Sequence, residues 1–307
     1  MILYRNMPNF YAGLYADRRA EEREDPAWFR KARADPDTRF VITAGTLHLL
    51  QGHPEPRILF LDNDHPVVAA ANEQEAILLG WFQDARCVLI EISRPEIPEV
   101  PAGAIFEELR PLSTRLPADE AGLLAYVRAL VIWRSRHQFC GVCGSPTTSQ
   151  RAGHMVRCSN PDVAHEHFPR IDPAVIVLVT DNDRVLLGRQ ASWPAGRFST
   201  IAGFVEPGES LEDAVLREVH EETGVRVQEI EYHSSQPWPF PSSLMLGFRA
   251  VARTHEISLR DGELEDARWF TRDEIAAGHP ALPPPGSISS RLIEGWFGQP
   301  GGPPSRW

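Results

Sequence analysis

The sequence has no hydrophobic run long enough to cross a membrane, and it has few cysteines. None of its apolar stretches approaches the roughly 20 residues that a membrane span needs. Residues 1–6 are not followed by the apolar core and small-residue cleavage site of a secretory signal. Three of the four cysteines lie close together, which favours a metal site in a reducing compartment over a disulfide framework. We therefore expect a cytoplasmic protein without a membrane partner.

Basic residues are also in short supply. Lys and Arg number 31 against 42 Asp and Glu, which gives a net charge of −11 at pH 7. This balance argues against a nucleic-acid partner held mainly through phosphate contacts. It does not exclude a small anionic substrate, because a bound metal ion screens such a substrate locally. The length of 307 residues fits two domains or one large one, and an apolar fraction of 42% is ordinary for a globular protein with a real core.

The first part of the chain has the pattern of a small, mostly β domain. Short apolar runs start at residues 40, 46, 57, 76 and 87 and are separated by Gly, Pro, Asn and Asp. Cys87 lies in the last run and is expected to be a buried apolar residue. Residues 117–134 predict a helix because apolar side chains recur at helical spacing. The charged residues 17–33 predict a second, polar helix.

A new domain starts at residue 171. The apolar run 174–179, the Asp-Asn-Asp turn and the return at 185–187 predict a β-hairpin. Further strands are expected at residues 243–252, 257–259 and 267–270, and short helices at 271–274 and 289–296. Strands, one long helix, more strands and a terminal helix predict a layered α+β domain.

The most informative stretch covers residues 203–225, where a Gly/Pro loop leads into a helix. Ser210 is a candidate N-cap, and Asp213 three residues later completes a weak capping box. Gly224 stands where a helix requires a left-handed residue after its last turn. These signals predict a helix that begins after Ser210 and ends before Gly224.

Three glutamates of this helix share one side of it. At about 100° per residue, Glu218, Glu221 and Glu222 point into an arc that overlaps the apolar stripe. They repel one another and weaken an isolated helix. Most charge runs are solvated acidic surfaces, but here the carboxylates lie beside the buried face. They therefore need a compensating charge, and a hard divalent cation such as Mg²⁺ with oxygen ligands supplies it.

The spacing of this stretch resembles the Nudix hydrolase box. That box is a glycine, five residues, a glutamate, seven residues, then Arg-Glu-apolar-x-Glu-Glu-x-Gly-apolar. Its nine fixed positions are filled by Gly203, Glu209, Arg217, Glu218, Val219, Glu221, Glu222, Gly224 and Val225. The resemblance implies an α/β/α sandwich and metal-assisted hydrolysis of a nucleoside diphosphate linked to another group.

The clustered cysteines have the spacing of a zinc ribbon. A Cys-Gly-Val-Cys run is followed by a third cysteine after fourteen residues. Val163 stands where a fourth cysteine is expected, and His165 and His167 lie just downstream. Tetrahedral zinc accepts three cysteines and one histidine. We predict one structural Zn²⁺ per chain, held by Cys140, Cys143, Cys158 and His165; the alternative is a decayed site whose thiols survive as buried residues.

A Ser-Gln-Pro-Trp-Pro-Phe-Pro run at residues 235–241 alternates prolines with aromatic residues. Such a segment is rigid and partly extended, and by composition alone it is a loop that caps the core. Following the box, however, it resembles the mark of the NADH pyrophosphatase branch of the Nudix family. The order helix, ribbon, box, this run and a Leu-Pro-Pro-Pro-Gly stretch resembles that branch over residues 105–297.

The resemblance implies a metal site and a base. Glu218, Glu222 and the backbone carbonyl of Ala202 would hold catalytic Mg²⁺ or Mn²⁺, with Glu263 as a later carboxylate. One carboxylate must stay free to accept a proton from the attacking water. Glu221 and Glu263 are the two candidates, and Glu221 is favoured slightly.

The resemblance also implies a set of supporting and substrate-binding residues. Arg217 would orient the box by pairing with Glu209. Phe204 would stack on a base, and Phe168 stands where the branch often has a tyrosine. The other substrate contacts would be Gln236, Pro237, Trp238, Pro239, Phe240, Pro241, Ser242, Ser243 and Ser289.

The implied reaction is hydrolysis of NAD(H) to nicotinamide mononucleotide and AMP. One alternative is a Nudix enzyme for ADP-ribose or ADP-sugars. Another is a non-catalytic sensor of nicotinamide nucleotides, which the intact set of three glutamates disfavours. Removal of NAD caps from RNA uses the same chemistry, although the acidic net charge gives it no support.

The sequence divides into four parts. We expect an N-terminal α+β domain over residues 1–135, a zinc-ribbon segment over 136–170, a Nudix domain over 171–300 and a tail over 301–307. The resembled branch is typically a homodimer, and the resemblance therefore implies the same assembly here.

Overall fold

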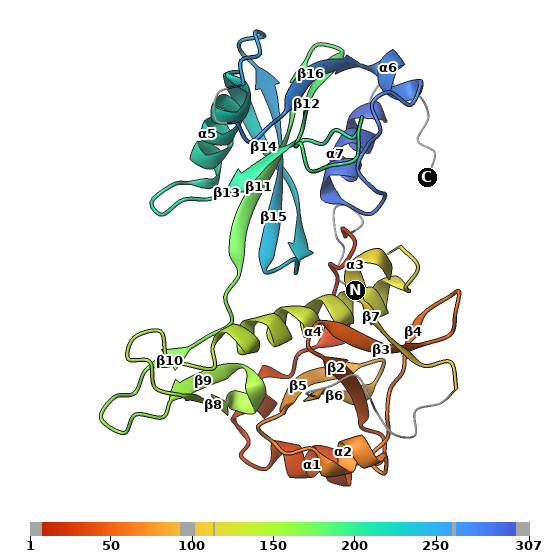
Figure 1. Cartoon of the computed structure of the whole chain (residues 1–307), viewed down its shortest axis with the longest axis vertical. Coiled ribbons are helices and arrows are strands. Elements are labelled where there is room, and N and C mark those ends of the chain that lie inside the picture. Colours follow the sequence, from red (N-terminus) through yellow and green to blue (C-terminus); the bar gives the residue numbers. More distant parts are fainter. Residues whose placement is uncertain (1–7, 93–101, 113, 260–261, 299–307) are drawn as a thin grey trace. The chain divides into compact units, whose positions relative to one another are not determined.

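The computed structural model describes residues 8–92, 102–112, 114–259 and 262–298 (Figure 1). These residues fall into two compact units. The first, here called the carboxylate unit, contains residues 8–10, 172–238, 243–259 and 262–298. The second, here called the N-terminal unit, contains the described residues between 11 and 171 together with residues 239–242. Across the described ranges, no helix has the length and apolar character needed to span a membrane.

A mixed sheet of seven described strands forms the centre of the N-terminal unit, in the order β1-β5-β6-β2-β3-β4 with β7 paired to β3. The strands are β1 (Ala16–Asp17), β2 (Arg39–Ala44), β3 (Leu47–Gln51), β4 (Arg57–Ile58), β5 (Ala76–Phe82), β6 (Ala85–Ile92) and β7 (Ile105–Glu108). Every apolar run assigned to this domain from the sequence contributes to the sheet. The mostly β character is therefore confirmed. Cys87 is buried, as expected.

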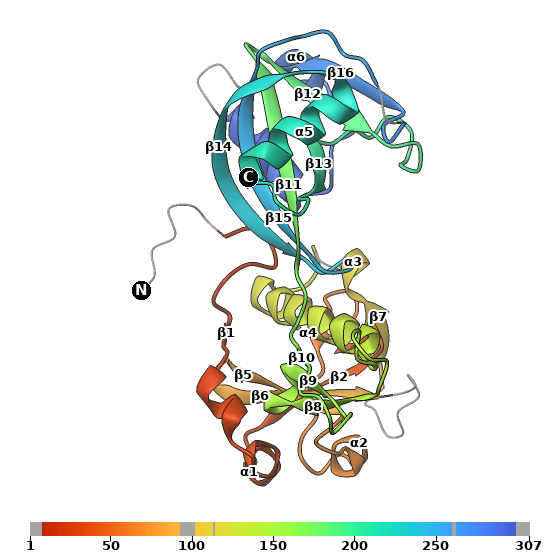
Figure 2. The same cartoon turned by 90° about the vertical axis from the view of Figure 1, so that its left-hand side faces the viewer.

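Helices cover both faces of this sheet (Figures 1 and 2). α4 (Ala118–Arg136) lies on one face, and α1 (Trp28–Ala34) and α2 (Pro66–Ala70) lie on the other. A single turn, α3 (Leu109–Leu112), comes before α4. α4 confirms the helix predicted over residues 117–134, and its apolar side chains are buried as the helical spacing required.

The predicted polar helix over residues 17–33 is wrong in its extent. The structure has a 3₁₀ helix, η1 (Ala20–Glu24), and then α1 from Trp28. Asp25 between them is extended, with φ −76° and ψ 114°. It precedes Pro26, and the ring of a proline disfavours the helical conformation of the residue before it. The charge pattern does not indicate this break, whereas the position of Pro26 does.

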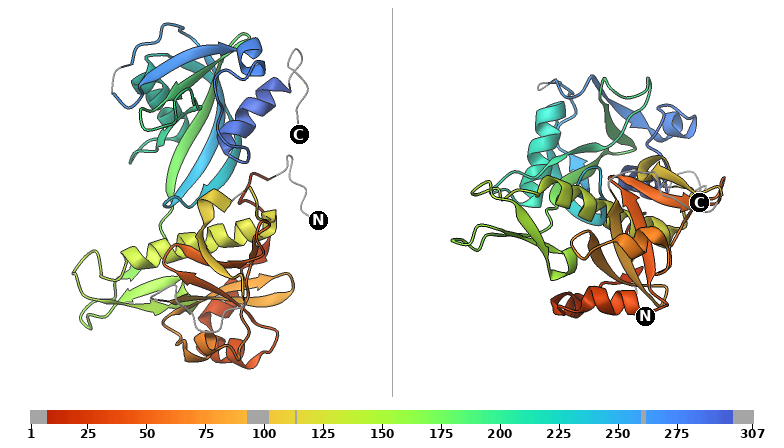
Figure 3. Two further views of the ribbon diagram at one scale, coloured as in Figure 1. Left: turned by 45° about the vertical axis from the view of Figure 1, so that its right-hand side comes forward. Right: turned by 60° about the horizontal axis from the view of Figure 1, so that its bottom comes forward.

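Three short strands form the cysteine-containing ribbon. They are β8 (Thr147–Gln150), β9 (Met155–Cys158) and β10 (Glu166–His167), antiparallel in the order β10-β9-β8. The 3₁₀ turn η2 (Arg151–Gly153) joins β8 to β9. The ribbon follows the C-terminal end of α4 (Figures 1 and 3).

The carboxylate unit is a sandwich around a six-stranded mixed sheet in the order β14-β15-β11-β12-β16, with β13 paired to β11. The strands are β11 (Asp172–Asp181), β12 (Arg184–Arg189), β13 (Ile201–Phe204), β14 (Val227–Trp238), β15 (Ser243–Ala252) and β16 (Asp266–Thr271). α5 (Leu211–Thr223) covers one face, and α7 (Ile288–Phe297) covers the other (Figure 1). A short α6 (Arg272–Ala276) follows β16. The predicted α/β/α arrangement is confirmed.

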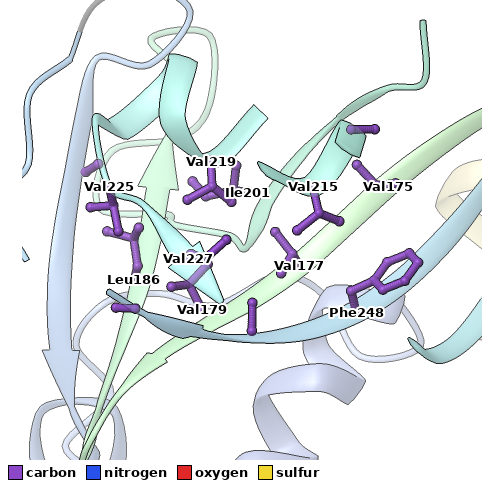
Figure 4. Close-up of a cluster of buried hydrophobic side chains, with 14 of the residues drawn as sticks. Val175, Val177, Val179, Leu186, Ile201, Val215, Val219, Val225, Val227 and Phe248 are labelled. Atoms are coloured by element: carbon purple, nitrogen blue, oxygen red, sulfur yellow. The ribbon is translucent and has the colours of Figure 1, made fainter. Parts of the chain in front are cut away.

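The central strand β11 supplies the core on both faces. Its Val175, Val177 and Val179 pack under α5 against Val215 and Val219 (Figure 4). The alternate residues of β11 pack on the other face with α7. A strand buried on both sides reads as a continuous apolar run, which is how residues 174–179 appear in the sequence.

Most of the elements expected in this unit are present. The β11–β12 hairpin, β15, β16, α6 and α7 are confirmed. The strand expected at residues 257–259 is wrong, because these residues pair with no strand. Instead the Ser258 backbone N–H donates to Thr223 O at 2.8 Å, at the C-terminal end of α5. The segment therefore passes the end of the helix rather than joining the sheet.

Candidate active site and cysteine cluster

Helix α5 begins and ends at the residues that its local signals indicate. The Ser210 hydroxyl accepts from Asp213 N at 3.1 Å, and the Asp213 carboxylate accepts from Ser210 N at 3.1 Å. This is a complete capping box. At the other end Gly224 is left-handed, with φ 72°. The caps fix the ends of the helix, and the packing of Val215 and Val219 against β11 fixes its rotation relative to the sheet.

That rotation directs two of the three glutamates inward. Glu218 and Glu222 are buried, with only 8% and 4% of their surface exposed. Glu221 lies at the solvent edge of the same arc, and 52% of its side chain is exposed. Buried carboxylates without an opposite charge are costly, so this arrangement requires cations nearby.

Strand β13 lies directly against the carboxylate of Glu218. A Cβ atom at Gly203 would fall far inside contact distance of that carboxylate, so no larger residue fits there. Gly203 follows Ala202, whose backbone carbonyl is one of the oxygen donors expected from the sequence. Helix α5 and strand β13 are therefore in close contact, with the Glu218 carboxylate against the backbone of Gly203.

Arg217 supplies the protein's own positive charge to this cluster. Its Nε and Nη2 donate to the two oxygens of Glu209 at 2.6 and 2.9 Å, a bidentate pair. Its Nη1 donates to Glu218 Oε1 at 2.9 Å and to Glu221 Oε2 at 3.0 Å. Its Nη2 also donates to Phe204 O at 2.8 Å. Hydrogen bonds from Arg217 lower the pKa of Glu209 to about 2.

One guanidinium does not neutralise the cluster. Burial raises the pKa of Glu218, and the negative charges of Glu221 and Glu263 act in the same direction, while Arg217 opposes them. Glu263 lies outside α5, but it is thus close enough to raise the pKa of Glu218. A half-buried set of donors made only of oxygen, with excess negative charge, fits a hard divalent cation.

Two of the residues expected to touch substrate are buried in the carboxylate unit. Gln236 is 0% exposed; its Nε2 donates to Phe10 O at 3.0 Å and Gly286 O at 2.8 Å, and its Oε1 accepts from Ile288 N at 2.8 Å. Ser289 is 3% exposed and is bonded to residues 199 and 200. Both side chains use their hydrogen bonds inside the protein.

The other expected substrate residues divide between the two units. Phe204, at the end of β13, is 57% exposed, and Pro237, Trp238 and Ser243 are intermediate in exposure. Phe168 belongs to the N-terminal unit and is 52% exposed. The remaining residues, also in the N-terminal unit, are Pro239, Phe240, Pro241 and Ser242.

Phe240 is held in place within the N-terminal unit. The guanidinium of Arg128 lies 5.1 Å from the centre of its ring, and that of Arg110 lies 5.7 Å away. Arg128 Nε also donates to Pro239 O at 3.0 Å. Cation–π contacts of this kind fix an aromatic ring and leave less of it free to stack on a ligand. Sequence reasoning did not identify Arg128, because nothing in α4 links it to a residue 111 positions away.

The ribbon gathers the four residues that the sequence selected. The ligand atoms of Cys140, Cys143, Cys158 and His165 all lie within 4.8 Å of one another. Cys143 Sγ is 3.3 Å from Cys158 Sγ, and His165 Nδ1 is 3.4 Å from Cys140 Sγ. Hydrogen bonds from Ser145 are the main reason that the pKa of Cys143 falls to about 6. Thiolates and one imidazole at this spacing fit tetrahedral zinc.

A second histidine reaches the same cluster. His167 Nε2 lies 3.3 Å from Cys140 Sγ, the sulfur that His165 also approaches. The ring of His167 packs near that of His137, with ring centroids 6.3 Å apart. An N–H donor on a ligating sulfur steadies the thiolate. The sequence placed His167 next to the site but did not reveal this contact.

Three family models match successive parts of the chain. The NADH pyrophosphatase-like rudimentary NUDIX domain matches residues 37–133. The NADH pyrophosphatase zinc ribbon domain matches residues 135–168, and the NUDIX domain matches residues 170–291. The last match includes both α5 and β13, the two elements that carry the carboxylate cluster.

Curated relatives match over most of the chain. The NAD-capped RNA hydrolase NUDT12 of Macaca fascicularis is 34% identical, over 94% of this chain and 73% of its own length. The NAD-capped RNA hydrolase NudC of Mycobacterium bovis is 43% identical, over 72% of this chain and 75% of its own. The protein of the same name from Stutzerimonas stutzeri is 44% identical, over 70% of this chain and 75% of its own.

Proposed function

The chain belongs to the Nudix hydrolase family, in the group with a zinc ribbon and an NADH pyrophosphatase-like domain, and we propose that it hydrolyses the pyrophosphate of NAD(H). The products are AMP and nicotinamide mononucleotide, in its reduced form when the substrate is NADH. The observation that carries the proposal is the pair of buried carboxylates, Glu218 and Glu222, packed beside β13. A protein that only binds nucleotides gains nothing from burying them.

In this proposal Glu218, Glu222, Glu263 and the carbonyl of Ala202 hold Mg²⁺ or Mn²⁺. When bound, the metal neutralises the pyrophosphate and stabilises charge on the leaving phosphate. Arg217 keeps the carboxylates apart and aligned through its bonds to Glu218 and Glu221.

Glu221 is the favoured acceptor of the proton from water. Its side chain is 52% exposed, so solvent reaches it while Glu218 and Glu222 remain buried. Its bond to Arg217 fixes one carboxylate oxygen and leaves the other free. Glu263 is the alternative base, because it is close enough for its charge to raise the pKa of Glu218. Glu221→Gln and Glu263→Gln should separate the two, since only loss of the base removes the acidic limb of the pH–rate profile without weakening Mn²⁺ binding.

Substrate binding in this proposal uses residues of the carboxylate unit. Phe204 is more than half exposed, which leaves its ring free to stack on a base of the dinucleotide. Pro237, Trp238 and Ser243 line the site within the same unit. Gln236 and Ser289 contribute from inside the protein, by holding α7.

Product analysis tests the reaction. The purified protein is incubated with NADH, NAD⁺ or ADP-ribose in the presence of Mg²⁺ or Mn²⁺, in water enriched in ¹⁸O. We expect AMP and the mononucleotide, with the label on one of the two phosphates. Release of free nicotinamide would mean a glycosidic cut and a different reaction. Faster hydrolysis of ADP-ribose than of either dinucleotide would favour the ADP-sugar alternative.

Removal of NAD caps from RNA is the second candidate function. The names of the relatives from Macaca fascicularis, Mycobacterium bovis and Stutzerimonas stutzeri favour it. A net charge of −11 predicts that few RNA phosphates are contacted, so binding should depend weakly on salt. The test is release of 5′-monophosphate RNA from an NAD-capped oligoribonucleotide between about 50 and 200 mM salt.

The proposal extends to the ribbon and the assembly. One structural Zn²⁺ per chain sits at Cys140, Cys143, Cys158 and His165, where the match to a zinc ribbon and the gathered side chains support it. Clustered free thiols suit a reducing compartment, which supports a cytoplasmic location. We include a homodimer in the proposal, and light scattering of the purified chain tests it directly.

A further inference from the structure

Three basic side chains converge on the face of the carboxylate unit that α5 does not cover. They are His233 on β14, Arg249 on β15 and Arg291 on α7. Phe248, next to Arg249 along the strand, lies in the core under α5 (Figure 4). Because side chains alternate along a strand, Arg249 points to the opposite face, where α7 packs.

The guanidinium of Arg249 rests on the backbone of α7. A Cβ atom at Gly295 would lie 2.6 Å from Arg249 Nη2 and 3.9 Å from His233 Nε2. The two nitrogens therefore meet over the same turn of the helix. Arg291 stands one turn earlier in α7. Burial lowers the pKa of His233 to about 4, and the charges of Arg249 and Arg291 add to this effect.

Arg249 lacks a paired counter-charge among the residues that the structure describes. There, the Arg249 side chain makes no hydrogen bond or ion pair, and its Nε atom is buried without a partner. Its cross-strand neighbour Glu231 is exposed and forms no ion pair with it. Glu294 acts on Arg291 electrostatically but accepts its own hydrogen bond from Ser290. A half-buried guanidinium without an acceptor is unfavourable unless a ligand supplies one.

A hydrogen-bond chain connects Arg291 to His233. Arg291 Nη1 donates to Asn9 Oδ1 at 2.9 Å, which orients the amide so that Nδ2 donates to Ser235 O at 2.7 Å and Ser234 Oγ at 3.0 Å. Ser234 Oγ lies 2.8 Å from His233 Nδ1. In the tautomer whose Nδ1 accepts the Ser234 proton, the imidazole proton is on Nε2, the nitrogen that lies over α7 beside Arg249. All three side chains thus offer N–H donors.

We propose that His233, Arg249 and Arg291 form a binding site for one phosphate group of a small phosphorylated molecule. A phosphate offers several acceptor oxygens and the negative charge that the Arg249 side chain lacks. The cluster is compact, whereas a nucleic-acid strand needs a stripe of cations along its backbone. It lies across the sheet from the carboxylate cluster, so it is a second site and does not rest on the proposed reaction.

Binding of inorganic phosphate to the full-length chain tests the site. The protein is kept free of added Mg²⁺ and Mn²⁺, so the carboxylate cluster does not attract the anion. Phosphate replaces chloride at constant ionic strength, and calorimetry and the melting temperature are followed. We expect saturable binding to wild type that weakens at least about tenfold in Arg249→Gln and Arg291→Gln, as for loss of a charge-assisted hydrogen bond.

Two variants serve as controls. Arg268→Gln removes the same charge from β16, where the side chain is 65% exposed and pairs with Asp266. It should bind phosphate as wild type does. Arg249→Lys keeps the charge and should retain most of the affinity. In the absence of phosphate, Arg249→Gln should melt at or above the wild-type temperature, because it relieves repulsion between the two arginines and breaks no described side-chain bond.

The outcomes separate the alternatives. Equal phosphate affinity in wild type and Arg249→Gln would overturn the proposal, as would indistinguishable behaviour of phosphate and chloride. A phosphate-free melting temperature several degrees lower in Arg249→Gln would show a structural arginine and also overturn it. AMP should bind at the same site as phosphate. Binding of a 5′-phosphorylated oligoribonucleotide without binding of AMP or phosphate would replace the small ligand by RNA and refute the assignment.

Discussion

The hydroxyl of Ser289, on the first turn of α7, lies 2.8 Å from the hydroxyl of Thr200, just before β13. Ser289 Oγ also accepts from Thr200 N at 3.2 Å and lies 2.9 Å from Ser199 Oγ. β13 contains Ala202, and the next residue of this strand, Gly203, packs against the carboxylate of Glu218. Ser289 thus connects α7 to the strand that supplies the expected carbonyl ligand.

Replacing Ser289 by Ala tests this connection. The change leaves Thr200 N without its buried acceptor, which costs about 1–3 kcal/mol of stability. We expect a lower melting temperature and a weaker activation by Mn²⁺, with the KM for NADH little changed. Ser289→Thr, which keeps the hydroxyl, should recover part of both losses. A raised KM with unchanged stability would instead identify Ser289 as a direct substrate contact.

Replacing Glu222 by Gln tests the metal site. The side chain is buried and the amide has the same shape, so the fold should persist while a metal ligand is lost. We expect kcat to fall by at least about 100-fold. Circular dichroism and NADH turnover are measured on the same preparation. Glu212→Gln, an exposed change in the first turn of α5, serves as the control and should leave turnover unchanged. Near wild-type turnover of Glu222→Gln in excess Mg²⁺ would remove Glu222 from the site.

The sequence predicts α5 closely because all of its signals are local. Ser210, Asp213 and Gly224 define its ends, and the glutamate spacing defines its inner face. The strand predicted at residues 257–259 is wrong for the opposite reason. Its apolar pattern favours a strand, but the Ser258 N–H finds its acceptor at Thr223, across the fold. Local propensity does not contain that information.

The same limit applies to the site. The motif around Gln236 can be recognised in the sequence. The Gln236 amide, however, accepts from Ile288 N, 52 residues away, so its burial depends on how α7 packs. Glu263 likewise reaches Glu218 only through the tertiary fold. Residue types and spacing therefore predict which chemistry the chain carries. They do not show which of its polar side chains face solvent.

Acid should destabilise the N-terminal unit through His48. This residue is 1% exposed, and its two ring nitrogens have no hydrogen-bond partner among the described residues. Burial lowers the pKa of His48 to about 3, and the charge of Arg128 adds to the effect. The unfolded chain takes up this proton below pH 6.5 and the native one only near pH 3. Stability is therefore present above pH 6.5 and is lost as the pH falls towards 3.

His48→Leu isolates this contribution. Between pH 6.5 and 5 the wild type should lose about 2 kcal/mol through His48, at about 1.4 kcal/mol per pH unit. The leucine variant should lack that part of the loss, because no group at this position titrates. Hydrogen exchange of residues 39–51 at the two pH values measures local stability. An identical pH dependence in both proteins would show that His48 is already protonated, or solvated, in the native state.

The ribbon should bind one zinc ion per chain, and its two histidines should behave differently. His165 belongs to the set of four ligand atoms within 4.8 Å, so His165→Ala should lose the metal and loosen the ribbon. His167 approaches only the sulfur of Cys140, at 3.3 Å. His167→Ala should therefore keep the zinc but release it faster to a chelator, because the thiolate loses a donor.

Metal analysis and chelator kinetics on wild type and the two variants test the roles of the two histidines. His137→Ala serves as a control, because it removes the ring that neighbours His167. The control should keep its zinc, because His137 lies outside the set of gathered ligand atoms. Loss of zinc from His167→Ala but not from His165→Ala would exchange the roles of the two histidines. A wild-type protein free of zinc after preparation without chelators would mean that packing alone holds the cysteine cluster together.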